Sequence, residues 1–182
     1  MIDLSKIPFP EPIMDTISDV EEFEKSPLAE QFPYTDSYNL ICESAKRLGD
    51  ATALEFLLQG LPDEPCQTVT YNQLRQQITR TANLLNKLGV GESDSVSIIL
   101  PILPQTHFAI WGSQAAGISN PINPMLEAEH IREIIDAADS KVVICLGHSA
   151  HSDIREKVLE AVKDCKTINT ILEINAPGLC DP

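Results

Sequence analysis

Basic residues are scarce in this 182-residue sequence, which has 13 Lys and Arg against 27 Asp and Glu and a formal net charge of −14. A negative charge of this size repels the phosphate backbone of nucleic acids and the anionic headgroups of membranes. We therefore expect neither nucleic acid nor an acidic membrane surface as a partner.

Paired cysteines are also lacking. The five cysteines form no Cys-x-x-Cys pair and are odd in number, and a chain of this length buries enough apolar surface to fold without disulfides. We expect them to be reduced. The N-terminal segment lacks the basic and apolar regions of a signal peptide, because Pro8, Pro10 and Pro12 interrupt any apolar run. Both observations favour the cytoplasm.

Charge is missing altogether from residues 95–126, and uncharged apolar stretches of about 18 or more residues are candidates for membrane helices. Four prolines interrupt this stretch, and its Gln, His and Asn side chains would be costly in hydrocarbon. A parallel sheet covered on both faces accounts for it better, because the strands of such a sheet are continuous apolar runs. We expect no membrane span.

Proline and acidic residues are concentrated in residues 1–33, which hold five prolines and eight acidic residues. This composition predicts an extended arm with at most one short helix, near 20–24, because proline ends helices. The chain as a whole is 43% hydrophobic and 22% charged, as in ordinary globular domains. We expect three parts: the arm, an α/β body over 34–174 and a tail over 175–182.

The first half of the body predicts two helices, because apolar residues recur at three- and four-residue intervals over 36–48 and 71–88. The first is capped by Thr35 or Asp36 and the second by Thr70, and a glycine follows each helix as its stop signal. Between the helices we expect a loose antiparallel hairpin, with strands at 53–58 and 67–71.

From Gly91 onward, short apolar strands alternate with amphipathic helices. The expected strands are 95–100, 118–122, 141–146 and 167–174. The expected helices are 105–116, 128–138 and a third that buries Ile154, Val158, Ala161 and Val162. Strands separated by helices of about ten residues are joined by right-handed crossovers. The predicted fold class is α/β, with a doubly wound, mostly parallel sheet, flanking helices, an N-terminal arm and a small antiparallel hairpin.

Five landmarks follow one another between residues 68 and 144. They are a Thr70-Tyr71-x-x-Leu74 helix start, a Leu88-Gly89-Val90 turn, a Gly91-x-x-Asp94-x-Val96 strand, a proline-bearing strand end at 100–104, and Ala116-Gly117 followed by the loop 120–124. In this order they resemble the acyl-CoA synthetases of the AMP-forming, adenylate-forming superfamily. Physical chemistry alone explains each landmark as a cap, a stop or a turn and indicates only an α/β fold.

The resemblance implies an enzyme that joins a fatty or aromatic carboxylic acid to ATP with Mg²⁺, releases pyrophosphate, and passes the acyl group to coenzyme A. The family's phosphate loop, a Ser/Thr/Gly-rich run ending in Pro-Lys, does not occur in these residues, and neither do its adenine motif and its C-terminal lysine. We therefore expect the N-terminal fragment of such a ligase, inactive alone and holding no cofactor tightly. Its partners would be the rest of the parent enzyme or a second copy of itself.

The resemblance also implies that Asn123 and Pro124 lie near the nucleotide end of coenzyme A. Asn-Pro is equally a common turn former, and this turn is poorer in glycine than that of some relatives. No residue is predicted to be catalytic.

Three histidines are candidate site residues. His148 and His151 lie between a predicted strand and a predicted helix, and are either metal ligands or solvated loop residues beside the helix caps Ser149, Ser152 or Asp153. No cluster of cysteines or carboxylates completes a metal site, so none is predicted. His107 either faces a polar ligand or is a half-buried residue that binds the loop before its helix.

Two other interpretations remain open. The chain is either a ligase fragment or a free-standing, non-catalytic α/β module that binds a small molecule or a protein. A nicotinamide-dependent oxidoreductase is disfavoured, because the Gly-x-Gly at 89–91 follows a helix and lacks the third glycine of the dinucleotide fingerprint.

Overall fold

The computed structural model describes residues 14–27, 30 and 34–180. Contacts divide the chain into two units, Met1–Asp36 and Ser37–Pro182. The first unit contains helix α1 (Ile17–Phe23), which begins at a capping box: the Asp19 N–H donates to Thr16 Oγ1, and the Asp19 carboxylate accepts from the Thr16 N–H. The helix starts three residues earlier than expected because of this box. Much of the expected extended arm lies outside the described residues.

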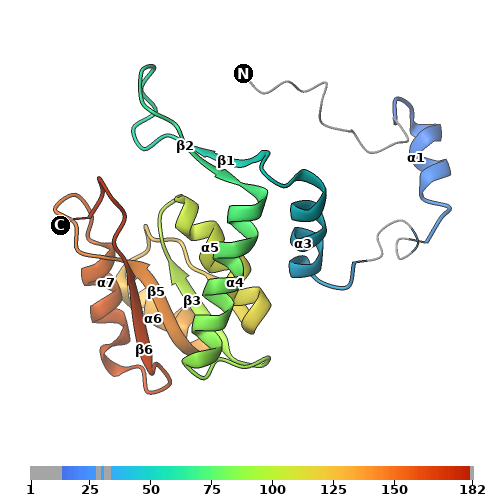
Figure 1. Ribbon diagram of the computed structural model, residues 1–182. Coiled ribbons are helices and arrows are strands. Elements are labelled where there is room, and N and C mark those ends of the chain that lie inside the picture. The colour runs from blue at the N-terminus through green and yellow to red at the C-terminus, as the bar shows by residue number, and fades with distance from the viewer. Residues whose placement is uncertain (1–13, 28–29, 31–33, 181–182) are drawn as a thin grey trace. The chain divides into compact units, whose positions relative to one another are not determined.

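Four parallel strands form the sheet of the second unit. They are β3 (Ser95–Ile99), β4 (Ile118–Pro121), β5 (Ser140–Leu146) and β6 (Thr170–Ile174). Their order is β4-β3-β5-β6, and every neighbouring pair is parallel, which confirms the doubly wound sheet (Figure 1). All residues of β3 and nearly all of β5 are buried, as expected for central strands.

Three helices connect these strands: α5 (Pro104–Ala116), α6 (Ala128–Ala137) and α7 (Ile154–Ala161), the last extended by a 3-10 turn, Val162–Asp164. Right-handed crossovers place α5 on one face of the sheet and α6 and α7 on the other. Contacts agree, since α5 packs on α4 (Tyr71–Lys87), whereas α6 packs on α7 (Figure 1). A membrane-spanning helix would have to be longer or more apolar than any helix in the described part of the chain.

The core lies on both faces of this sheet. Val96, Ile99, Val142 and Val143 of the central strands are all 0% exposed, and Ile135 of α6 is equally buried. Each of these positions belongs to a strand predicted from an apolar run or to a helix predicted from apolar periodicity, so both patterns identified buried positions correctly.

The remaining elements of this unit are α3 (Ser37–Leu48), the antiparallel strands β1 (Thr52–Phe56) and β2 (Gln67–Thr70), and α4. Thr70 caps α4 in a capping box with Gln73, and Gly89 ends the turn that follows it with a φ of +85°. Gly112 of α5 lets α4 approach, because a Cβ there would meet the Thr81 side chain at 2.6 Å. The predicted hairpin and cap are confirmed.

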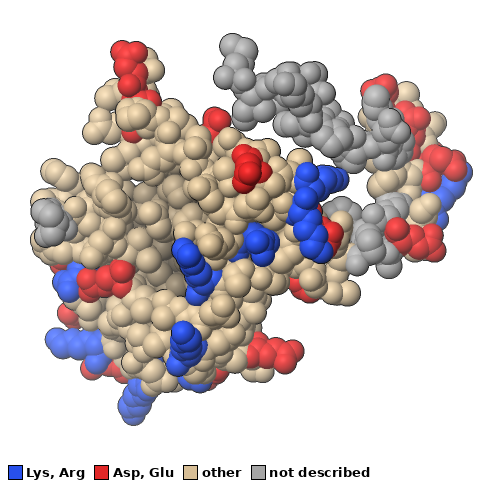
Figure 2. All heavy atoms as spheres, viewed as in Figure 1, with Lys and Arg blue, Asp and Glu red and all other residues tan. Residues whose placement is uncertain are grey.

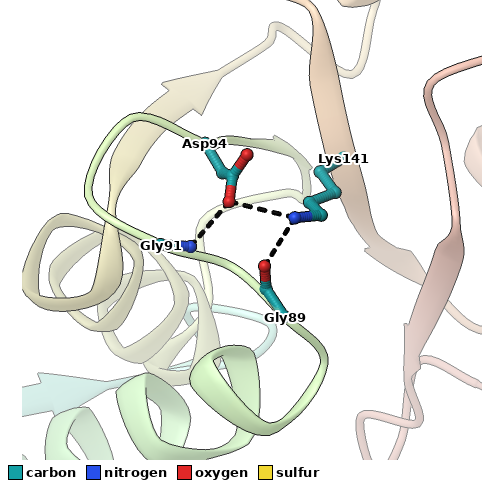
Figure 3. Close-up of polar contacts among 4 residues, drawn as sticks. All are labelled: Gly89, Gly91, Asp94 and Lys141. Carbon is teal, nitrogen blue, oxygen red and sulfur yellow. Dashed lines mark hydrogen bonds and ion pairs between the residues drawn. The ribbon is translucent and has the colours of Figure 1, made fainter.

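A polar clamp holds the amino edge of the sheet (Figure 3). The Lys141 ammonium of β5 donates to the Gly89 carbonyl at 2.6 Å and to Asp94 Oδ2 at 3.1 Å, and that same oxygen accepts from the Gly91 N–H at 2.7 Å. These hydrogen bonds lower the pKa of Asp94 from its ordinary 3.8, the Gly91 N–H contributing most. The clamp joins the turn after α4 to the start of β5.

Candidate functional site

The carboxyl edge of the parallel sheet contains the topological switch point. Strand β3 lies between β4 and β5, so the chain leaves β3 toward β4 and then returns past it to β5. In open α/β sheets, ligands bind outside the carboxyl ends of the strands where the order reverses. The segments that follow β3 and β5 therefore form the candidate site.

A cavity of about 560 Å³ lies at this edge. The hairpin contributes residues 55–58 to its walls, and the segment after β3 contributes residues 101–103. Leu146 at the end of β5, four residues between 149 and 154 that follow this strand, and Leu179 complete the walls. Most of these side chains are apolar, and the polar ones are Glu55, Ser149, His151 and Ser152. Cavities of this size and composition are typical of small-molecule sites. The surface is visibly hollowed beneath the hairpin in Figure 2.

A second, more open groove of about 620 Å³ continues from the first across the loop after β5. Pro124 and Met125 after β4 form one side, and residues 149–154 with Glu156 form the other. Both hollows share Ser149, His151, Ser152 and Ile154, so this loop separates them. Together they follow the carboxyl ends of β4, β3 and β5.

Asn123 and Pro124 occupy a turn at the rim of the second groove. The Asn123 Oδ1 accepts a hydrogen bond from the Met125 N–H at 2.9 Å, and the Asn123 carbonyl accepts from the Leu126 N–H. The Asn123 side chain is exposed, and Pro124 lines the groove. The turn function of this pair is thus visible in the structure, and the implied role in coenzyme A binding remains a prediction.

The loop after β5 carries His148 and His151, both exposed. The His151 N–H donates to Ser149 Oγ at 3.3 Å, and Ser149 is 6% exposed. Asp153 occupies the cap position of α7 without a capping hydrogen bond and instead pairs with Lys157 at 3.1 Å. Within the described part of the chain, no three His, Cys, Asp or Glu side chains gather into a metal site.

His107 lies half-buried in the first turns of α5. The hydrogen bond that ties this helix start to the preceding loop comes from Thr106, whose Oγ1 donates to the Pro101 carbonyl at 2.6 Å. The sequence interpretation overlooked Thr106, although a hydroxyl residue two positions after a helix-starting proline could have signalled it.

The cysteine buried in β5 is not reactive. Cys145 of β5 is fully buried, and desolvation, with a further contribution from the Glu173 carboxylate, raises its pKa to about 12. Glu173 of β6 itself pairs with Arg155 of α7 at 2.9 Å. The Cys145 thiol therefore stays protonated and packs as a small apolar side chain.

The family model of AMP-binding enzymes matches residues 41–180. The chain belongs to this family. This AMP-binding segment is 32% identical to the marinolic acid–CoA ligase of Pseudoalteromonas sp. (strain SANK 73390), over 88% of this chain and 25% of that protein. It is 27% identical to acetyl-coenzyme A synthetase 2 of Pseudomonas putida, over 78% of this chain and 22% of that protein.

Solved structures of the family have the same fold. The anthranilate CoA ligase AuaEII in complex with anthranoyl-AMP superposes with a TM-score of 0.65 at 18% identity, over 83% of this chain and 26% of that chain. The N-terminal domain of FACL13 from Mycobacterium tuberculosis superposes with a TM-score of 0.60 at 20% identity, over 77% and 34%. The chain spans about a quarter of the length of the curated relatives it matches.

In the described part of the chain, no group of three His, Cys, Asp or Glu side chains is placed to hold a metal ion such as magnesium. Holding a triphosphate needs several backbone N–H groups and a cation, and the sequence contains no Ser/Thr/Gly-rich run ending in Pro-Lys. The two hollows at the carboxyl edge are the features that suit organic groups.

Proposed function

We propose that the polypeptide carrying this segment is an AMP-forming acid–thiol ligase. It would convert a fatty or aromatic carboxylic acid and ATP into an acyl-adenylate and pyrophosphate, and then transfer the acyl group to coenzyme A. The family match over residues 41–180 carries this proposal, and the names of the relatives, which are CoA ligases or synthetases, support it.

Within that enzyme, this segment would form part of the wall around the substrates. The apolar cavity at the carboxyl edge suits a hydrocarbon or aromatic group, because its polar side chains are few. The adjoining groove, with Asn123 and Pro124 at its rim, would face the nucleotide end of coenzyme A. The residues of this segment bind and orient, and the proposed chemistry needs groups that other segments supply.

The domain division follows from the same proposal. Residues 1–33 would be an arm, 34–174 one part of the large catalytic domain, and 175–182 a connecting tail, with the remainder of the parent enzyme as the partner that completes the site. We place the enzyme in the cytoplasm, a proposal supported by the five cysteines, which are all free thiols.

Pyrophosphate release tests the proposal. The 182-residue chain and the polypeptide encoded by its natural reading frame are each incubated with ATP, Mg²⁺, coenzyme A and a panel of carboxylic acids. We expect acid-dependent pyrophosphate release from the natural polypeptide if it includes a Ser/Thr/Gly-rich run ending in Pro-Lys, and none from the 182-residue chain. Turnover by the 182 residues alone would contradict their predicted inactivity, and no turnover in either case would favour a non-catalytic module.

A further inference from the structure

A line of hydrogen-bonded side chains crosses three strands of the parallel sheet. The Asn120 Nδ2 of β4 donates to Ser97 Oγ of β3 at 2.9 Å, Ser97 Oγ and Ser140 Oγ of β5 lie 2.7 Å apart, and Ser95 Oγ lies 3.4 Å from Ser140 Oγ. The three serines are between 0% and 4% exposed. Hydroxyls buried this deeply are costly unless they are hydrogen-bonded, so this line favours one arrangement of the three strands.

Strand β4 depends on the Asn120 contact more than its neighbours do. It lies at the edge of the described sheet and pairs with β3 alone over four residues. One of these is Pro121, which has no N–H to donate. Opposite β3, Asn120 is in register with Ser97, so their side chains lie on the same face and can bond.

The Asn120 contact also selects the register of β4. A slip by one residue would turn Asn120 to the other face and bring Ser119 in its place. The Ser119 hydroxyl is buried and makes no hydrogen bond to any described residue. Beside the backbone hydrogen bonds of the ladder, the Asn120 amide therefore ties β4 to β3, and the neighbouring Ser119 hydroxyl does not.

The loop at the rim of the second groove begins where β4 ends. The Ile122 N–H donates to the Ile98 carbonyl at 2.8 Å, and Ile122 is 4% exposed. The Asn123 turn follows immediately, with its bonds to the N–H groups of Met125 and Leu126. The position of this turn thus depends on the register of a short edge strand.

We infer that Asn120 is a positioning residue, which acts through the register of β4 to hold the 122–126 turn at the groove where coenzyme A would bind. The ligand in this inference rests on the proposed function. Asn120 itself touches no reacting group; its effect reaches the groove through three residues of backbone.

Amide hydrogen exchange in the 182-residue chain tests the positioning. Asn120→Ala should speed exchange of the Met125 and Leu126 N–H groups about five-fold, the factor that corresponds to one ordinary hydrogen bond. Ser97→Ala should speed this exchange at least as much, because it also removes the bond to Ser140 Oγ. The double variant should exchange little faster than Ser97→Ala, because the Asn120 bond is already lost in that variant. Asn120→Asp, whose carboxylate accepts from the Ser97 hydroxyl, should restore slow exchange.

Ser119→Ala is the matched control, because it removes a buried hydroxyl from the adjacent residue of the same strand without removing a hydrogen bond. Equal exchange in Asn120→Ala and Ser119→Ala would overturn the inference. So would faster exchange throughout the sheet, which would mean a general loss of stability.

Kinetics of the natural polypeptide test the ligand. Asn120→Ala should raise the KM for coenzyme A about five-fold while leaving acid-dependent pyrophosphate release unchanged. If Asn120→Ala slowed acid-dependent pyrophosphate release as much as acyl transfer to coenzyme A, the inference would be overturned and the proposed function would remain intact. A wild-type polypeptide that releases no pyrophosphate would instead refute the proposed function and with it the coenzyme A role, and amide exchange alone would then decide the positioning of the turn.

Discussion

At the scale of single residues, Ile135 shows how much one core side chain contributes. It is 0% exposed on α6, between the sheet and the helix layer. Ile135→Ala should lower the free energy of unfolding by about 3 kcal/mol, because it removes buried apolar surface and leaves a cavity. Urea unfolding measures this. Ile102→Ala is the control, because Ile102 is 84% exposed, and a loss as large as that of Ile135→Ala would contradict the assigned core.

The cysteines differ in reactivity for reasons of burial. Burial raises the pKa of Cys145 to about 12 and that of Cys165 to about 11, whereas Cys66 is exposed in the hairpin loop. Only the thiolate reacts, so a thiol reagent at about pH 8 should modify Cys66 quickly and Cys145 only after unfolding. Mass spectrometry of the labelled peptides measures this, with Cys66→Ala as the control. Rapid labelling of Cys145 in the folded chain would be inconsistent with its position in the sheet.

At the scale of elements, the Asp94–Lys141 clamp ties the turn after α4 to β5. The pKa of Asp94 is lowered on folding, so its carboxylate contributes stability that is present above its unfolded pKa, near 3.8, and is lost as the pH falls through the lower folded value. Asp94→Asn keeps an oxygen for the Gly91 N–H but removes the charge. We expect it to destabilise the chain at neutral pH.

Urea midpoints of wild type and Asp94→Asn across the acid range measure this effect. The difference between the two should shrink as the pH falls below the ordinary pKa of an aspartate, because the wild-type carboxyl is then neutral as well. Both partners of the pair are about one-third exposed, so solvent and salt weaken their attraction. A difference that is independent of pH would mean that the clamp acts through shape and not through charge.

The elements themselves were well predicted from the sequence, and the reasons are local. Strand β3 is a continuous apolar run that a proline ends, and α4 has a capping residue, a periodic apolar face and a glycine stop, so β3 and α4 were placed within one residue. Strand β6 was predicted three residues too long at its start, because residues 167–169 have strand-like composition but precede the paired segment. Start signals such as the Thr16 capping box were missed where proline and acidic residues dominated the composition.

At the scale of the whole second unit, features that depend on strand order could not be predicted. The Lys141 clamp and the Asn120–Ser97–Ser140 line join residues from strands that become neighbours only when the sheet forms. The cavity combines a hairpin loop with segments after β3 and β5, which lie far apart in the sequence. The sequence did place Pro124 and His151 at the carboxyl edge, because strand ends mark that edge in any parallel sheet.

The carboxyl edge also exposes apolar side chains, and this leads to a prediction about association. Ile102 and Met125 are 84% and 80% exposed, and Leu57 of the hairpin is 45% exposed. On the face in view, Figure 2 shows uncharged surface beneath the hairpin, whose tip carries acidic side chains. Exposed apolar patches drive association in water. We therefore expect the 182-residue chain to form dimers or larger aggregates at high concentration.

Light scattering over a range of concentrations measures this association. Ile102→Glu combined with Met125→Glu should shift the chain toward monomer, because each change places a charge in the surface that would be buried. Ile118→Glu is the matched control, since Ile118 is 52% exposed at the opposite, amino end of β4. A chain that stays monomeric throughout would show that the carboxyl edge does not drive self-association, and an equal shift with Ile118→Glu would mean that added negative charge, and not this edge, controls it.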